Sequence, residues 1–281
     1  MMQSVRRFPR ITTRIALTGP RLIHSTSILR GSVEKCPPPD RDTGCTYCMP
    51  DMDKFPKPTK QVPPVPFHAK HLVISTGTSD WPSRIHTDET SMAAVLEPLK
   101  RGVLSTKDPV LITNSDLPVH EGVDPTQAGS AFLYPDGLYF PSIPYEKMEQ
   151  FAEAYLGDRV GDEILPDIPV LEHKSPIVLI CGHGARDERC GIIAPMLAKE
   201  FKAALTQHDL LYDPETNPEG VRVALCSHIG GHAFAGNVIY HCGDQGADPV
   251  WYSLVFPHHV QGIVKTTIVD GNIVQELARR R

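Results

Sequence analysis

The sequence predicts an α/β fold with two similar lobes. Short apolar, β-branched runs alternate with helical patterns over 70–156, and a similar alternation returns over 177–274. A connecting segment rich in Asp and Pro separates the two stretches at 157–175. Alternating strands and helices are typical of α/β folds. The chain has 281 residues, of which 41% are hydrophobic, enough for one large domain or two ordinary ones.

Residues 1–30 have the composition of a mitochondrial transit peptide. They hold six arginines and several Ser and Thr, and no acidic residue precedes Glu34. An arginine-rich leader without acids suits import driven by the membrane potential. We therefore expect a mitochondrial protein of the matrix; a disordered basic tail is the alternative.

Residues 31–69 are predicted to be irregular, because prolines are frequent and the charges are mixed. This segment contains Cys36 and the pair Cys45 and Cys48, which are two residues apart. Such a pair occurs in redox dithiols and in zinc sites. Pro50 and the charged residues after it do not fit the helix that normally follows a redox pair. The interpretation favours inert or regulatory thiols.

The first lobe is predicted at 70–160. Its expected elements are a strand at 70–75, a helix at 89–99, a strand at 109–114, a hairpin of 131–134 with 138–140, and a helix at 145–156. This order of strand, helix, strand, hairpin and helix is thioredoxin-like. No cluster of metal-ligating residues lies in this part of the sequence.

The second lobe is predicted at 174–281 and repeats the order. Its expected elements are strands at 177–181, 221–226 and 251–256, a helix at 192–205, and a final segment at 260–274 whose structure the pattern leaves open. Unlike the first lobe, this one contains a group of cysteines and histidines.

Four residues of the second lobe are candidate metal ligands. Cys181 and Cys190 are separated by eight residues and lie on either side of a glycine-bearing loop after a strand. His228 and His232 follow the next strand, with Gly230 and Gly231 between them. Paired glycines let one loop present both rings to one centre. His183, His241, Cys226 and Cys242 are rival ligands.

Two cysteines with two histidines suit either zinc or an iron–sulfur cluster. Structural zinc sites usually place their cysteines closer together, whereas a wide loop with Gly182, Gly184 and Gly191 suits a larger two-iron centre. A phosphate-binding loop is a third interpretation, but it needs five residues between Cys and Arg, and four separate Cys181 from Arg186.

The spacing Cys181-x8-Cys190 and His228-x3-His232, with the sequence Ser227–Asn237 around the histidines, resembles the sucrase/ferredoxin-like family. The resemblance covers most of 70–274 and, with the leader, suggests a mitochondrial member. It implies a C-terminal thioredoxin-like ferredoxin domain. It also implies a [2Fe–2S] cluster held outside the Rieske fold by Cys181, Cys190, His228 and His232. The Cys45–Cys48 pair lies outside the matching part.

The predicted function is therefore single-electron transfer or redox sensing, rather than conversion of a substrate. Two neutral imidazoles in place of two thiolates predict a higher reduction potential than that of a four-cysteine ferredoxin. The expected partners are a redox protein of unknown identity and the iron–sulfur assembly machinery. A net charge of −5 argues against nucleic acid, and no run of 18 apolar residues predicts a membrane span.

Two other functions remain open on the sequence. One is a structural zinc-binding interaction protein without redox chemistry. The other is a thiol–disulfide oxidoreductase that uses Cys45 and Cys48.

Overall fold

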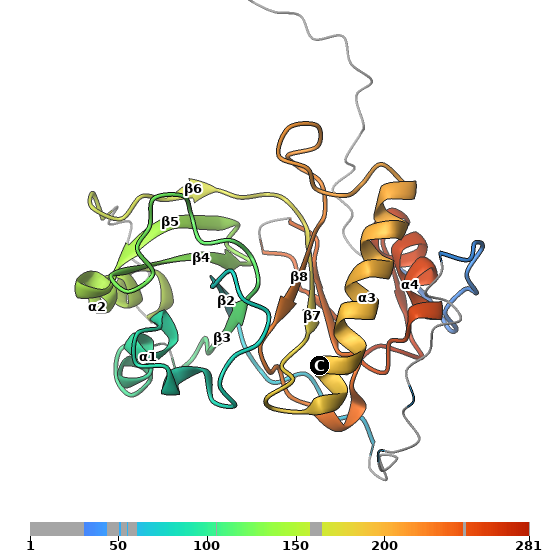
Figure 1. The fold of residues 1–281 in the computed structure, drawn as a ribbon, viewed down its shortest axis with the longest axis horizontal. Helices are drawn as coiled ribbons and strands as arrows, with labels where there is room; N and C mark the ends of the chain where they lie inside the picture. The colour runs from blue at the N-terminus through green and yellow to red at the C-terminus, as the bar shows by residue number, and fades with distance from the viewer. Residues whose placement is uncertain are drawn as a thin grey trace, which may run out of the picture.

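The computed structural model describes residues 31–43, 51, 55, 61–104, 106–157, 165–243 and 246–280. Within them, the chain forms a mixed α/β fold with a nine-stranded sheet, a separate two-stranded sheet, and helices on both sides (Figure 1). The predicted α/β class is confirmed. The predicted transit peptide and the Cys45–Cys48 pair lie outside the described residues.

The first half of the large sheet comes from residues 70–172. Its strands are β2 (Lys70–Ser75), β3 (Val110–Ser115), β4 (Ala128–Tyr134), β5 (Leu138–Pro144) and the short β6 (Leu171–Glu172). The helices are α1 (Met92–Leu96), which Ser91 caps, and α2 (Met148–Phe151). Further helical turns follow both, at Pro98–Lys100 and Ala152–Leu156.

The second half contains the candidate ligands. Its elements are β7 (Ile177–Cys181), α3 (Glu188–Gln207), β8 (Arg222–Cys226), β9 (Val238–His241), β10 (Val250–Tyr252) and α4 (Pro257–Ile263), which continues as a π-helical segment over Val264–Val269. β11 (Asn272–Val274) pairs in parallel with β1 (Gly31–Val33) and forms the small sheet.

The two halves of the large sheet have the same strand arrangement. The strand order is β10-β9-β7-β8-β3-β2-β4-β5-β6. In the first half, β2 pairs in parallel with β3 and antiparallel with β4. In the second half, β7 pairs in parallel with β8 and antiparallel with β9. The halves join where β3 meets β8, through the single antiparallel pair of Ser115 with Cys226. Cys226 therefore lies at the centre of the sheet.

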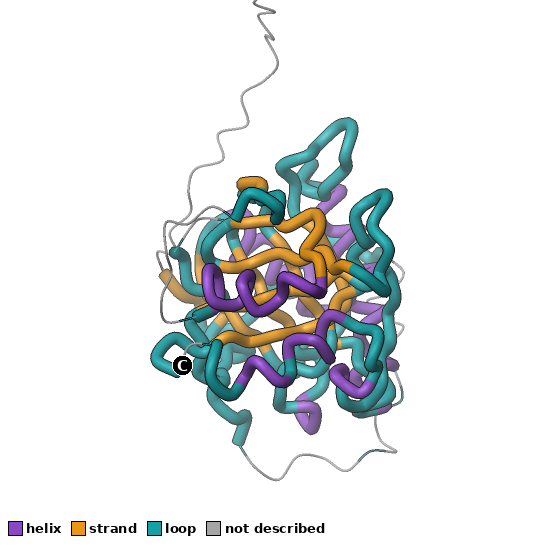
Figure 2. Tube along the Cα trace, turned by 90° about the vertical axis from the view of Figure 1, so that its left-hand side faces the viewer, coloured by secondary structure: helices purple, strands orange, loops and turns teal. Residues whose placement is uncertain are grey.

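Alternating side chains of β2 and β4 divide the core into two parts. Leu72 and Leu133 pack with the residues of α1 and α2, whereas Val73 and Phe132 belong to the core of the second half. Successive strand residues point to opposite faces of a sheet, so one face of the first half contacts its own helices and the other contacts the second half. In Figure 1, α1 and α2 lie on one side of the molecule and α3 and α4 on the other. Figure 2 shows helices in front of the strands when the molecule is viewed from the α1 and α2 side.

Several predicted boundaries were wrong. α3 begins at Glu188 rather than at residue 192, because Asp187 accepts a hydrogen bond from the amide of Arg189 and caps the helix earlier. Cys190 therefore lies on the first turn of α3 and not in the preceding loop. The sequence analysis missed β9, and β10 ends at Tyr252, since Leu254 has a positive φ of 57°. The predicted helix at 89–99 is shorter, at Met92–Leu96, with a 3₁₀ turn after it.

Among its described residues, the segment predicted to be irregular contains one strand, β1. Beyond it, Cys36 packs against α4, where its thiol donates to the carbonyl of His259 at 3.3 Å. Burial, followed by the negative charge of Glu276, raises the pKa of Cys36 to about 12. A thiol held in its protonated form is a poor nucleophile. These surroundings favour the neutral thiol of Cys36. None of the helices in the described part of the chain has the length and apolar character needed to cross a membrane.

Candidate metal centre

The two cysteines of the candidate centre are brought together by the turn from β7 into α3. Cys181 is the last residue of β7 and Cys190 lies on the first turn of α3, and each is 1% exposed. Their side chains are in hydrogen-bond contact. The loop between them folds back tightly, since a Cβ added to Gly191 would lie 2.9 Å from the Cα of Gly184. Glycine at both positions therefore permits the approach of the two cysteines.

The two histidines lie on the loop after β8. Gly230 and Gly231, between the histidines, have φ values of +81° and +72°, a conformation that glycine adopts without strain. The rings of His228 and His232 have their centres 5.5 Å apart. The two rings are therefore neighbours on this loop.

The two histidines differ in their surroundings. His228 Nδ1 is buried and has no hydrogen-bond partner among the described residues. By contrast, the side chain of His232 is 46% exposed, and its Nδ1 lies 2.5 Å from Oδ2 of Asp187. A buried ring nitrogen without a partner is costly, and a metal ion is one group that satisfies it. A histidine that bonds a carboxylate through one nitrogen is oriented to offer the other to a metal.

Hydrogen bonds favour the anionic form of Cys181. Its pKa is lowered by the hydrogen bond from the Cys190 thiol and, against the effect of burial, by His228 and the backbone N–H of His183. The same contact raises the pKa of Cys190, because two neighbouring thiolates repel each other. A bound cation would relieve that repulsion.

Asp187 connects the cysteine turn with the histidine loop. It caps α3, forms an ion pair with Arg189 at 2.8 Å and contacts His232. Burial alone would raise the pKa of Asp187, but the hydrogen bonds from Arg189 and His232 lower it to about 2. The sequence analysis missed this residue, although an Asp directly before a helical stretch is a common capping signal.

His183, a rival ligand on the sequence, has both ring nitrogens engaged. Its Nε2 lies 3.0 Å from the carbonyl oxygens of both Trp81 and Pro82, and its Nδ1 accepts the backbone N–H of His228 at 3.1 Å. Nε2 therefore carries the proton. His183 acts as a connector that fixes the start of the histidine loop, and it offers no free nitrogen to a metal.

His241 and Cys242 also have other surroundings. His241 lies 3.1 Å from His71 and its ring stacks on Tyr134, with centres 4.4 Å apart, so it belongs to the contact between the two halves of the sheet. Cys242 follows it at the end of β9 and is partly buried.

Cys226 is the closer rival. It pairs in register with Cys181 and is fully buried. Burial, and then the charges of Cys181 and Asp116, raise its pKa well above the ordinary value, which favours the neutral thiol. The pKa of Cys190 is raised as well, so this preference does not separate Cys226 from Cys190, and the choice of Cys190 as the second cysteine follows the family resemblance.

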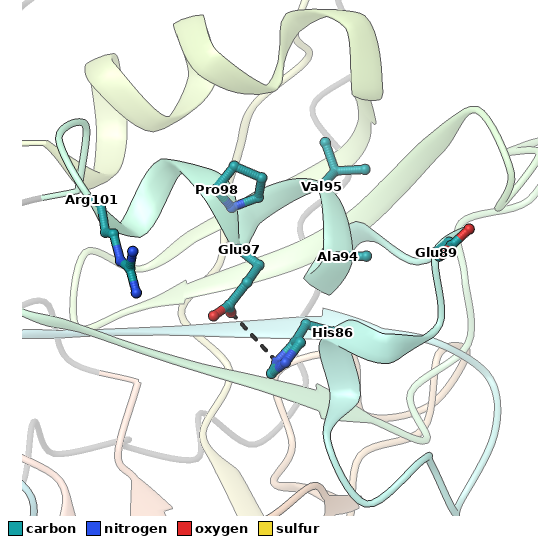
Figure 3. A pocket seen from close by; sticks show the side chains of 7 residues that line it. All are labelled: His86, Glu89, Ala94, Val95, Glu97, Pro98 and Arg101. Atoms are coloured by element: carbon teal, nitrogen blue, oxygen red, sulfur yellow. Dashed lines mark ion pairs between the residues drawn. The ribbon is translucent and has the colours of Figure 1, made fainter.

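In the described part of the chain, three or more His, Cys, Asp or Glu side chains do not converge in an arrangement that would hold one metal ion. The four candidate side chains are instead arranged as a pair of cysteines and a pair of histidines. A hollow of about 660 Å³ lies elsewhere, over α1, where His86, Glu97 and Arg101 are among the lining residues (Figure 3). His86 pairs with Glu97 at 3.5 Å there, and none of the candidate ligands lines it.

Comparison with known proteins identifies relatives over most of the chain. The sucrase/ferredoxin-like family model matches residues 63–280. The protein named altered inheritance of mitochondria protein 32 of Clavispora lusitaniae is 37% identical over 272 residues, covering 88% of this chain and 94% of its own. The protein of the same name from Debaryomyces hansenii is 35% identical over 233 residues, covering 75% and 81%.

Two further matches are shorter. Actin patches distal protein 1 of Saccharomyces cerevisiae is 39% identical over 108 residues, 38% of this chain and 34% of its own. The crystal structure of the Cys59Ser variant of the thioredoxin-like [2Fe–2S] ferredoxin from Aquifex aeolicus covers 38% of this chain and 99% of its own, with 17% identity and a TM-score of 0.27. A TM-score this low does not establish a common fold. The family match and the long relatives confirm the resemblance predicted from the cysteine and histidine motifs, and the chain belongs to the sucrase/ferredoxin-like family.

Proposed function

We propose that this chain is a mitochondrial iron–sulfur protein that binds one [2Fe–2S] cluster through Cys181, Cys190, His228 and His232. The observation that carries the proposal is the meeting of two buried, contacting cysteines with the histidine loop, where the buried Nδ1 of His228 has no partner among the described residues. The residues therefore fit the group that the family resemblance implies.

The arrangement in pairs also favours this metal group. A structural zinc ion takes four protein donors around one centre. A two-iron cluster with four protein ligands takes only two on each iron, so two pairs suffice. His228 would bind through Nδ1 and His232 through Nε2, because the Nδ1 of His232 contacts Asp187.

Bound there, the cluster would supply one-electron chemistry, with no bond made or broken. The protein's own residues supply the environment. Burial of both cysteines excludes water from one side, while the exposed His232 ring marks the side where a redox partner can approach. We propose single-electron transfer or redox sensing as the role, with the iron–sulfur assembly machinery as the source of the cluster.

The compartment and the domain plan are part of the proposal. The leader at 1–30 and the names of the long relatives support a mitochondrial protein, and we propose the matrix. The repeated strand arrangement supports two thioredoxin-like lobes, at 70–160 and 174–281, of which only the second holds the cluster.

Anaerobic purification with iron, sulfide and zinc analysis tests the cluster. We expect about two irons and two sulfides per chain, with visible absorption, for the unchanged protein. Cys181→Ser and Cys190→Ser should lose most of both. Cys242→Ser should keep them, because Cys242 lies at the end of β9, outside the centre. Zinc in place of iron, or a Cys226→Ser variant that alone loses its colour, would contradict the assignment. A variant with both Cys45→Ser and Cys48→Ser tests the alternative of thiol–disulfide exchange. If this variant transfers electrons as well as the unchanged protein does, exchange through these two cysteines is not the function.

A further inference from the structure

Arg279 is a buried cation beside the histidine loop. It follows β11 and is 6% exposed. Its guanidinium lies 5.1 Å from the centre of the Trp251 ring. The guanidinium donates to the carbonyl oxygens of Pro63 at 3.2 Å, Pro64 at 2.9 Å and Gly230 at 3.5 Å. All of these partners are neutral, and the ion pairs found among the described residues do not include Arg279.

A buried charge without an opposite charge is costly. Carbonyl oxygens and an aromatic ring satisfy the donors of a guanidinium, but they do not neutralise it. Burial lowers the pKa of Arg279, while the negative charge of Cys181 raises it. The charge of Cys181 therefore acts on Arg279 in the direction that favours the cation.

The position of the guanidinium agrees with this. Nη1 lies 3.5 Å from the oxygen of Gly230 and 3.5 Å from the place where a Cβ on Gly231 would stand. These glycines form the turn between His228 and His232. Through its bonds to Pro63 and Pro64, the same side chain also holds the segment before β2 against that turn. The cation thus contacts the loop that carries both histidines.

We propose that Arg279 is the charge-balancing and positioning residue of the cluster centre: it holds the turn between the two histidines and favours the state that carries one additional electron. This inference rests on the proposed function. Two thiolates and two neutral imidazoles around a core of charge +2 give a neutral site, and one electron makes it negative. A fixed positive charge in a low-dielectric surrounding stabilises the negative state more than the neutral one.

The test compares Arg279→Gln, which removes the charge, with Arg279→Lys, which keeps it but loses the planar fork of donors. Arg222→Gln is the matched control: Arg222 is also partly buried and lies over an aromatic ring, Tyr212, at 3.4 Å, at the end of β8 away from Cys226. The measurements are iron and sulfide per chain, the midpoint potential by optical redox titration at pH 7, and urea unfolding of the metal-free chains.

We expect Arg279→Gln to lower the equilibrium constant for reduction at least about tenfold, which is about 59 mV for one electron. Arg279→Lys and Arg222→Gln should stay near the unchanged protein in potential. Both Arg279 variants should lose stability in the metal-free state, because both lose hydrogen bonds. Equal potentials for all variants, or equal shifts for Gln and Lys, would mean a purely structural role and overturn the inference. An unchanged protein without iron would overturn the proposed function itself, and this inference with it.

Discussion

At the scale of single residues, His183 shows how a side chain outside the proposed ligands can fix the geometry of the candidate centre. It is 1% exposed and joins three segments: the loop before α1, the cysteine turn and the histidine loop. The sequence presented it as one more histidine near two cysteines. Only its hydrogen bonds distinguish a connector from a ligand, because both ring nitrogens are already in use.

We predict that His183→Phe destabilises the metal-free chain by about 1–3 kcal/mol, since it leaves the partly buried backbone N–H of His228 and the carbonyls of Trp81 and Pro82 without their partner. Urea unfolding measures the change. His208→Phe, at the exposed end of α3, is the control and should change the free energy of unfolding little. A His183→Phe chain as stable as the unchanged one would show that the connection contributes nothing.

At the scale of elements, the start of α3 decides where Cys190 lies. Asp187 ends the loop by capping the helix, so the second cysteine faces the first from a rigid turn of helix. The wide spacing of the cysteines in sequence therefore does not mean a wide, flexible loop. It contains a tight turn of six residues, 182–187, followed by the first helical residues.

We predict that Asp187→Ala lowers the free energy of unfolding of the metal-free chain by about 1 kcal/mol more than Asp187→Asn does, because Asn is an equally good cap. The contribution of the carboxylate has a defined pH range. Its pKa of about 2 in the folded chain lies below the ordinary 3.8, so the stabilisation is present above about pH 4 and is lost as the pH falls toward 2. Urea titrations at several pH values test both points. Equal stability of the two variants would contradict the capping role.

At the scale of the whole molecule, buried neutral histidines lie where the two halves of the sheet meet. His71 is 1% exposed and lies between Thr113, at 2.8 Å, and His241, at 3.1 Å. Burial, and then the nearby His241 and His68, lower its pKa well below 6.5. Burial, and then the charge of Arg222, lower the pKa of His173 to about 4.

The free energy of unfolding should therefore fall as the pH drops below about 6.5. The unfolded chain binds protons at these histidines and the folded chain does not, and each group contributes a slope of up to about 1.4 kcal/mol per pH unit. For His173 the loss ends near pH 4, where the folded chain also takes up its proton. Urea unfolding of the metal-free chain between pH 7.5 and 5 measures the slope. His173→Gln should make it shallower, whereas the exposed His208→Gln should not. A slope that His173→Gln leaves unchanged would refute this origin.

Import can be tested on the whole chain. Removing residues 1–30 leaves every described contact in place, since these involve residues from 31 onward. The truncated protein should fold, keep its unfolding midpoint and remain outside mitochondria in a fractionation experiment. Import of the truncated chain at the usual level would contradict the transit-peptide interpretation. The full-length chain is the control.

The sequence by itself determined the α/β class, most strands, the hairpin of β4 and β5 and the family, because these follow from local patterns. Apolar runs with turn residues mark strands, and the spacing of Cys181, Cys190, His228 and His232 identifies the family. The paired glycines likewise indicated a loop that presents both histidines, since positive φ values are a local property of glycine.

Only the tertiary structure decided which polar side chains share a space. The role of His183 depends on carbonyls about 100 residues away in sequence, and the burial of Arg279 depends on Pro63 and Pro64, more than 200 residues away. β9 escaped prediction because its four residues form a strand by pairing with β7 and β10 rather than by a clear local pattern. Hydrogen bonds and burial between distant segments leave no periodic signal in a sequence, and in this protein those contacts distinguish the candidate ligands from histidines such as His183, whose ring nitrogens are already in use.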